Sequence, residues 1–321
     1  MIGLKDKYKD YFKIGAAVNT KTVDTHSELL RGHFNSITCE NETKFINLQN
    51  EENKYSFHAA DKILKYAKDN DMVMRGHTFV WHNQTPEWVF KDATKDILLK
   101  RMKDHISHVG KRYEHDFYCW DVVNEAIDDK SELLYRKSPW SEIIGENFMD
   151  YAFYYAKEVL PETDLYYNDY NESNFPKRDK IYKTVKDMLD RGVPVDGIGL
   201  QCHWNIYYPP MDDVKRAIEQ YAGLGVKLQV TEMDVSVYES EDSPKLDRPG
   251  IELLNRQTAI YKEGFKIFRE YKDVINTVTL WGVADDETWL DNFPVQGRKN
   301  WPLLFDENHK PKEALYAIMD F

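Results

Sequence analysis

The sequence has little cysteine and no long apolar run. Its 321 residues contain three cysteines, Cys39, Cys119 and Cys202, an odd number at distant positions. A disulfide framework is therefore not expected, and buried, reduced thiols are. No stretch approaches the ~18 apolar residues of a membrane span, and the first residues lack the apolar segment of a signal peptide. We expect no membrane partner and a cytoplasmic protein, or a secreted one if a leader has been removed.

An excess of positive charge is also lacking. Lysine and arginine total 43 against 55 aspartates and glutamates, for a net charge of -12. Such a chain would repel a phosphate backbone, which argues against a nucleic-acid partner but permits a neutral substrate. Aromatic residues, in contrast, make up 14% of the chain and include 8 Trp and 21 Tyr. Their flat rings suit both core packing and contact with the apolar faces of sugars. No prediction of oligomeric state follows from composition.

Short β-rich runs alternate with amphipathic stretches of helical spacing, such as residues 59–70, 95–113 and 256–271. Strands and helices that alternate in this way build a parallel sheet. The expected strands are eight, at residues 12–19, 36–41, 72–81, 117–125, 164–171, 197–204, 228–234 and 275–283.

A glycine-rich phosphate-binding turn does not follow the first expected strand, where Asn19 is followed by Thr-Lys-Thr. This absence disfavours an open dinucleotide-binding sheet and favours a closed α/β barrel, the (β/α)8 or TIM barrel. Polar and aromatic residues gather at the C-terminal ends of the runs, where barrel enzymes place their active sites. No repeat or linker interrupts the chain, so residues 1–321 are predicted to form one catalytic domain, with residues 239–249 and 285–302 as loops over the barrel mouth.

Two glutamates fall at the catalytic rim of this predicted barrel. Glu125 ends the fourth expected strand and Glu232 lies in the seventh. Hydrolysis of a glycosidic bond needs one protonated carboxyl to donate to the leaving oxygen and one ionised carboxylate to attack the anomeric carbon or activate water. A single strand-end glutamate is more often solvated or held in a salt bridge. A pair at opposite staves favours catalysis.

Strand alternation predicts which neighbours share a face. Residues two or four apart on a strand point the same way, so His77 and Trp81 should share one face, and Gln201 and His203 should share another. His82 lies five residues after His77 and would face away from it, which weakens a two-histidine metal site.

Several further residues carry both a binding and a structural interpretation. After the second expected strand, a polar group either contacts substrate or caps a helix. The two tryptophans near the last strand either stack on sugars or fill the core, and the tyrosine after the fifth strand either contacts the leaving group or caps the next helix. These residues are Glu40, Asn41, Lys44, Trp281, Trp289 and Tyr170.

Six motifs together resemble glycoside hydrolase family 10, the endo-β-1,4-xylanases. They are RGHTFVWHNQTPEW (75–88), WDVVNEA (120–126), YNDYN (167–171), GIGLQCHW (197–204), VTEMD (230–234) and LWGVADDETWL (280–290). The resemblance covers nearly the whole chain in order. It implies a retaining double displacement on xylan or xylo-oligosaccharides, with no cofactor and no catalytic metal.

The resemblance also implies roles for individual residues. Glu125 would be the general acid/base and Glu232 the nucleophile, with Asn124 near the 2-hydroxyl of the attacked sugar and His203 bonded to the nucleophile. Tyr170 would contact the aglycone sugar. The glycone subsites would be lined by Glu40, Asn41, Lys44, His77, Trp81, Gln201, Trp281 and Trp289.

The spacing of the carboxyl groups predicts how the acid is kept protonated. Retaining enzymes hold the two groups about 5 to 5.5 Å apart, so the charge of Glu232 should raise the pKa of Glu125. Glycosylation of Glu232 would remove that charge and turn Glu125 into a base.

Three other interpretations remain open on the sequence alone. The same two-carboxylate chemistry serves other retaining barrel glycosidases, such as an endoglucanase. A metal-dependent hydrolase could use His77, His82, His203 and acidic neighbours, although a His-x-His pair on the first strand is missing. A catalytically silent sugar-binding protein is the third, and the presence of both glutamates argues against it.

Overall fold

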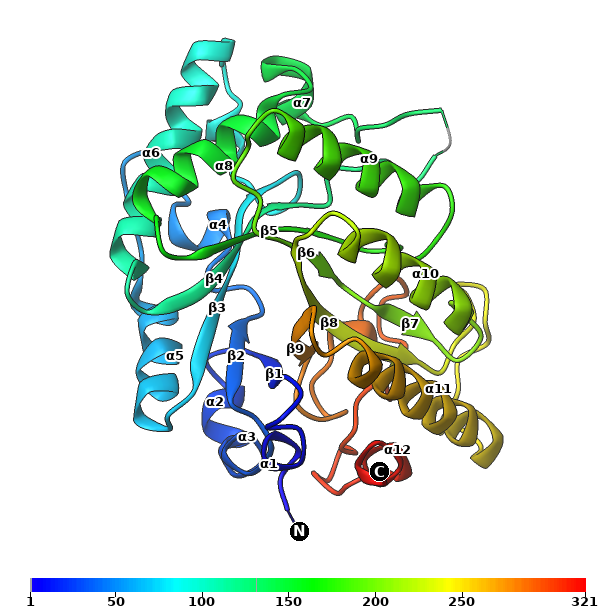
Figure 1. Ribbon diagram of the computed structural model, residues 1–321. Helices are drawn as coiled ribbons and strands as arrows, with labels where there is room; N and C mark the ends of the chain where they lie inside the picture. The colour runs from blue at the N-terminus through cyan, green and yellow to red at the C-terminus, as the bar shows by residue number, and fades with distance from the viewer. Residues whose placement is uncertain (1, 131) are drawn as a thin grey trace.

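A closed ring of parallel strands surrounded by helices forms the molecule (Figure 1). The computed structural model describes residues 2–130 and 132–321. The strands follow the order β6-β5-β4-β3-β2-β1-β9-β8, and β6 pairs back onto β8, which closes the barrel. Their bounds are β1 Lys13–Val18, β2 Ser36–Cys39, β3 Val73–Trp81, β4 Phe117–Asn124, β5 Asp164–Asp169, β6 Gly197–Leu200, β7 His203–Asn205, β8 Lys227–Ser236 and β9 Ile275–Leu280. The predicted TIM barrel is confirmed.

The helices cover the outer face of the ring (Figure 1). The buried positions of α10, Val214, Ala217, Ile218 and Tyr221, show the usual spacing of a helix that packs one face on a sheet. The helical elements are α1 Leu4–Lys7, α2 Thr22–Thr25, α3 Ser27–His33, α4 Phe45–Leu48, α5 His58–Asp69, η1 Glu87–Val89, α6 Lys95–Tyr113, α7 Pro139–Ile144, α8 Phe148–Val159, α9 Lys177–Asp190, α10 Met211–Ala222, α11 Ile251–Glu270, η2 Trp289–Asp291 and α12 Glu313–Met319.

The sixth expected strand is the one that departs from the prediction. Residues 197–204 do not form one strand but split into β6 and β7, with Gln201 and Cys202 between them. Cys202 adopts a φ of 56°, a left-handed conformation that cannot continue a strand. The β7 segment then pairs with β8, where His203 lies opposite Asp234. This break carries the chain from the barrel wall to the rim of the mouth.

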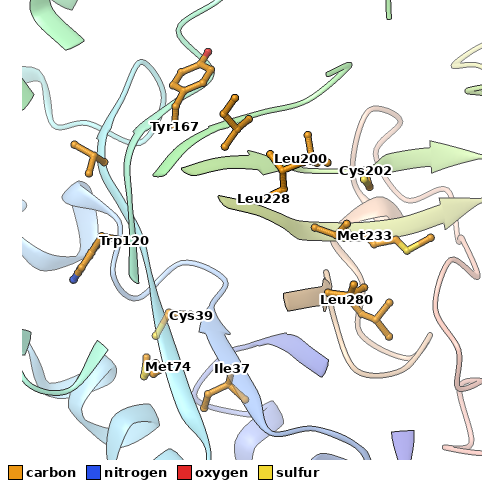
Figure 2. Packing of buried hydrophobic residues seen from close by; sticks show 14 of the residues in the cluster. Ile37, Cys39, Met74, Trp120, Tyr167, Leu200, Cys202, Leu228, Met233 and Leu280 are labelled. Carbon is orange, nitrogen blue, oxygen red and sulfur yellow. The ribbon is translucent and has the colours of Figure 1, made fainter. Parts of the chain in front are cut away.

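Large apolar side chains fill the space between strands and helices. Figure 2 shows Trp120 and Met74 on the helix-facing side of their strands, and Met233 beside Leu280. The Trp120 ring stacks on Phe79 with centroids 4.0 Å apart. All three cysteines are buried and unpaired, as predicted. Within the described residues, no helix is both long and apolar enough to cross a membrane.

Candidate active site

A cavity of about 700 Å³ opens at the C-terminal ends of the strands. It brings together every site residue that the sequence predicts, from strands and loops across the barrel. Its lining consists of Glu40, Asn41, Lys44, His77, Trp81, His82, Asn83, Gln84, Asn124, Glu125, Arg136, Tyr170, Gln201, His203, Glu232, Trp281, Trp289, Asn292 and Phe293.

Glu125 follows directly on the last residue of β4. Its φ of 57° lies in the left-handed region, where a non-glycine residue is uncommon and strained. Its backbone N–H donates to the Asn168 carbonyl at 2.9 Å, which holds this conformation. The turn exposes the carboxyl group to the cavity, where Trp81 Nε1 donates to Oε2 at 2.8 Å and Gln201 Nε2 to Oε1 at 3.1 Å.

Glu232 lies inside β8 and is only 4% exposed. Nitrogen atoms surround its carboxylate. Asn168 Nδ2 donates to Oε1 at 2.7 Å, His203 Nε2 lies 3.2 Å from Oε2, and His77 Nδ1 lies 3.9 Å from Oε1. A buried carboxylate that has donors on both oxygens can stay ionised without water.

These surroundings shift the pKa values of the two carboxyl groups in opposite directions. Burial on its own would raise the pKa of Glu232, but His77, His203 and the Asn168 amide outweigh it and lower the pKa to about 2. The pKa of Glu125 is raised, first by burial and then by the charge of Asp169. Glu232 also raises it, but less than Asp169 does. The direction agrees with the sequence-based expectation, whereas the main cause is different.

Side-chain amides connect the two glutamates. Asn124 Oδ1 accepts from Asn168 Nδ2 at 2.9 Å and from Gln201 Nε2 at 3.2 Å. Asn168 also donates to Glu232, and Gln201 also donates to Glu125. A single chain of hydrogen bonds therefore fixes the positions of both carboxyl groups relative to each other.

His77 is oriented from below by a buried ion pair in the barrel interior. Asp121 accepts from Arg75 Nη2 at 2.7 Å through Oδ1, while its Oδ2 lies 2.9 Å from His77 Nδ1. Arg75 Nε also donates to Gln229 at 2.6 Å. All of these side chains are buried. A charge that is buried here needs such partners, and they fix the imidazole beside Glu232.

One wall of the cavity consists of the polar group that follows β2. Lys44 Nζ donates to Asn41 Oδ1 at 3.1 Å and lies 4.9 Å from the Trp81 ring centroid. Lys44 immediately precedes α4 but makes no side-chain capping bond there. Burial lowers the pKa of Lys44 and raises that of Glu40. These residues face the cavity, which favours the substrate-binding interpretation over helix capping.

Aromatic rings form another part of the cavity wall. Trp289 Nε1 donates to Asp234 Oδ2 at 2.8 Å, and its ring lies 4.9 Å from that of His203. Trp281 meets His77 edge-on at 5.3 Å. Phe293, 56% exposed, stacks on Trp289 at 5.0 Å and extends this wall outward.

Tyr170 stands on the side of the cavity that the resemblance gives to the aglycone. Its hydroxyl donates to Asp129 Oδ2 at 2.5 Å and accepts from Arg136 Nη2 at 2.6 Å. Lys177 Nζ lies 3.6 Å from the ring centroid. The ring is therefore held rigidly, as a platform for an apolar sugar face would be.

Comparisons with known proteins agree with this geometry. The model of glycosyl hydrolase family 10 matches residues 3–321. The chain belongs to glycosyl hydrolase family 10. It is 51% identical to endo-1,4-β-xylanase A of Caldicellulosiruptor saccharolyticus, over 100% of this chain and 96% of that protein. It is 50% identical to an endo-1,4-β-xylanase of Geobacillus stearothermophilus, over 99% and 98% of the two chains.

Solved structures share the fold of this family 10 chain closely. The endo-1,4-β-xylanase of Caldicellulosiruptor owensensis superposes with a TM-score of 0.97 at 51% identity, covering 100% of both chains. A variant solved in complex with xylotriose superposes with a TM-score of 0.98 at 48% identity, also covering 100% of both chains.

Some residues that line this family 10 site were not predicted from the sequence. His82 was expected to face away from His77, yet it also lines the cavity. Because β3 ends at Trp81, the alternation of the strand no longer applies to His82. Arg136 and Phe293 lie in loops, whose paths no periodic pattern predicts.

The metal-dependent alternative finds no support among the described residues. The three histidines proposed for it, His77, His82 and His203, do not form a group with ligand atoms close enough to share an ion. Burial lowers the pKa of His82 to about 4, with the charges of Arg136 and Lys177 adding to the effect.

The influence of Asp169 on Glu125 yields a prediction. In the Asp169→Asn variant the pKa of Glu125 should fall, because one of the charges that raises it is gone. Since the general acid must be protonated, the alkaline limb of the kcat/KM profile should shift to lower pH.

Asp129→Asn is the matched control for that measurement. Asp129 pairs with the same Lys177 that pairs with Asp169, at 3.0 Å and 2.8 Å respectively, but it is not among the principal causes of the raised pKa of Glu125. Its alkaline limb should stay in place. Equal shifts in both variants would contradict a direct effect of Asp169.

Proposed function

We propose that this chain is an endo-1,4-β-xylanase that hydrolyses internal β-1,4-xylosidic bonds of xylan or xylo-oligosaccharides with net retention. The observation that carries the proposal is the pair of glutamates in one cavity whose pKa values are driven apart. Paired carboxyls with opposite shifts are the requirement for acid-assisted glycoside cleavage. The curated relatives at about half identity are endo-1,4-β-xylanases, which supports the choice of substrate.

In the first step, Glu232 attacks the anomeric carbon and forms a glycosyl ester, while the bond to the leaving oxygen breaks. Glu125 gives its proton to that oxygen, so the aglycone leaves as a neutral alcohol. The raised pKa of Glu125 keeps this proton available, and the lowered pKa of Glu232 keeps the nucleophile ionised near neutral pH.

In the second step, water replaces the departed aglycone. Glu125, now a carboxylate, takes a proton from the water as its oxygen attacks the anomeric carbon and the ester bond to Glu232 breaks. Esterification has removed the negative charge of Glu232, which lowers the pKa of Glu125 for this role. Burial and the charge of Asp169 remain, so Glu125 loses only the part of its raised pKa that is due to Glu232.

The walls of the cavity define how the sugars are held. Asn124 lies between the two glutamates, where its amide can contact the 2-hydroxyl of the attacked sugar. Trp281 and Trp289 offer ring surface on the glycone side, and Tyr170 does so on the aglycone side. A xylosyl unit lacks the C5 hydroxymethyl group of glucose, and space for this group separates a xylanase from an endoglucanase.

The outcome of hydrolysis tests substrate and stereochemistry together. We expect xylohexaose to be cleaved, with β-anomers among the first products in proton NMR spectra recorded before mutarotation, because double displacement retains configuration. Cello-oligosaccharides of equal length are the control and should be cut far more slowly. Early α-anomers, or cleavage of the cello-oligosaccharides alone, would contradict the proposal.

A pair of isosteric variants tests the assigned roles. Glu125→Gln should lose about 10²- to 10⁴-fold of its activity on xylan, the usual contribution of a general acid. It should still release a burst of nitrophenol from 4-nitrophenyl xylobioside, since this leaving group needs no proton.

Glu232→Gln should lose both activities, because no ester can form. The comparison therefore separates the acid from the nucleophile. Full activity of Glu125→Gln on xylan, or a nitrophenol burst from Glu232→Gln, would show that the roles are assigned wrongly.

A further inference from the structure

Outside the active site, two histidines and one aspartate from distant parts of the chain meet. His26 lies between α2 and α3, Asp286 lies in the loop after β9, and His309 lies in the turn that precedes α12. His26 Nε2 is 2.9 Å from Asp286 Oδ1, and His309 Nε2 is 3.3 Å from Asp286 Oδ2. One potential ligand atom from each of the three residues falls within 4.8 Å of the others.

The hydrogen bonds of Thr25 bear on which nitrogen of His26 carries a lone pair. Thr25 Oγ1 lies 3.2 Å from the Lys21 carbonyl and 2.7 Å from His26 Nδ1, and when it donates to the carbonyl it accepts from Nδ1. In a neutral imidazole the proton is then on Nδ1, and Nε2 carries the lone pair. Two lone pairs, of Nε2 and of the Asp286 carboxylate, would face each other at 2.9 Å. A cation between them removes this repulsion, either a metal ion or a second proton on the ring.

We infer that His26, Asp286 and His309 form a Zn²⁺ site. Imidazole and carboxylate are ligands that Zn²⁺ accepts at bond lengths of about 2.0 to 2.2 Å, which separates neighbouring ligand atoms of a tetrahedral site by roughly 3.4 Å. The observed separations, 2.9 Å to Oδ1 and 3.3 Å to Oδ2 of Asp286, are close to that value, and one ligand atom from each residue lies within 4.8 Å of the other two. The Nδ1 bond of His26 to Thr25 matches the outer partner that metal-bound histidines usually have.

The exposure of the three residues suits entry of an ion and a fourth, water ligand. The side chain of His26 is 1% exposed, while those of Asp286 and His309 are 35% and 34% exposed. The neighbouring Glu287 does not compete for the ion, because Lys21 Nζ lies 2.6 Å from its Oε2 and Asn19 Nδ2 donates to its Oε1. The proposed site is therefore anchored in the interior and open on one side.

The position of Asp286 gives this ion a structural role. Asp286 lies in the loop between Trp281 and Trp289, both of which line the catalytic cavity. An ion bound to His26 and His309 would tie this loop to the N-terminal helices and to the C-terminal turn. Zn²⁺ should therefore stabilise the folded enzyme against unfolding, because it binds the native arrangement of ligands and not the unfolded chain.

Metal binding is measured on the full chain, first treated with EDTA and then dialysed. Titration with ZnCl₂ in a calorimeter should show one ion per chain, and Tm should rise when Zn²⁺ is added. At a free Zn²⁺ concentration 100 times Kd, the unfolding equilibrium constant should fall about 100-fold. Co²⁺ in place of Zn²⁺ should give the visible absorption of a tetrahedral site.

Three variants assign the ion to its ligands. His309→Ala and Asp286→Asn should lose the bound ion and the rise in Tm, and both change partly exposed side chains that the fold tolerates. His115→Ala, which removes an exposed histidine elsewhere, should bind as the parent does. Absence of binding in the parent would mean that protons, not Zn²⁺, hold the cluster together and would overturn the inference. Unchanged binding in His309→Ala and Asp286→Asn would overturn it as well.

Discussion

Two carboxyl groups that face one cavity have to be held in opposite protonation states, and the architecture around them serves this constraint. Glu232 is ionised because nitrogen atoms of Asn168, His203 and His77 face its oxygens. Burial opposes a charge on His203, but Asp234 and Glu232 outweigh it and raise the His203 pKa to about 10. The buried ion pair beneath His77 belongs to the same arrangement. Removing one partner of such a pair leaves an uncompensated charge, so each partner depends on the others.

The barrel makes this arrangement possible because all of its parallel strands end at the same rim. Glu125 comes from the end of β4, Glu232 from β8, and the amides between them from β4, β5 and the break between β6 and β7. The backbone departs from regular geometry at two of these points. The left-handed conformation of Glu125 turns its side chain into the cavity, and that of Cys202 carries β7 out to the rim. Local strain of this kind persists only where surrounding contacts enforce it.

Motifs in the sequence predict which residues line this site, but strand periodicity explains less of it. Alternation groups His77 with Trp81 and Gln201 with His203, and all four line the cavity. Neither stretch is a regular strand, however, because β3 shifts register after His77 and Gln201 lies in the break before β7. Alternation is therefore not the reason for their shared position. It fails at His82, beyond the end of β3, and it cannot anticipate the split of the sixth strand at Cys202. The influence of Asp169 on Glu125, which exceeds that of Glu232, was also missed, since it depends on a distance through space. The contact between His26 and Asp286, which are 260 residues apart, was missed for the same reason.

The most direct test of the opposed protonation states is carbon NMR of the enzyme with labelled glutamate carboxyls, assigned with Glu125→Gln and Glu232→Gln and followed as a function of pH. We expect the Glu232 signal to remain that of a carboxylate until the pH falls to about 2. The Glu125 signal should titrate above the ordinary value of glutamate, about 4.3. Titration of both groups near the ordinary value, or of Glu232 above Glu125, would contradict the opposed protonation states.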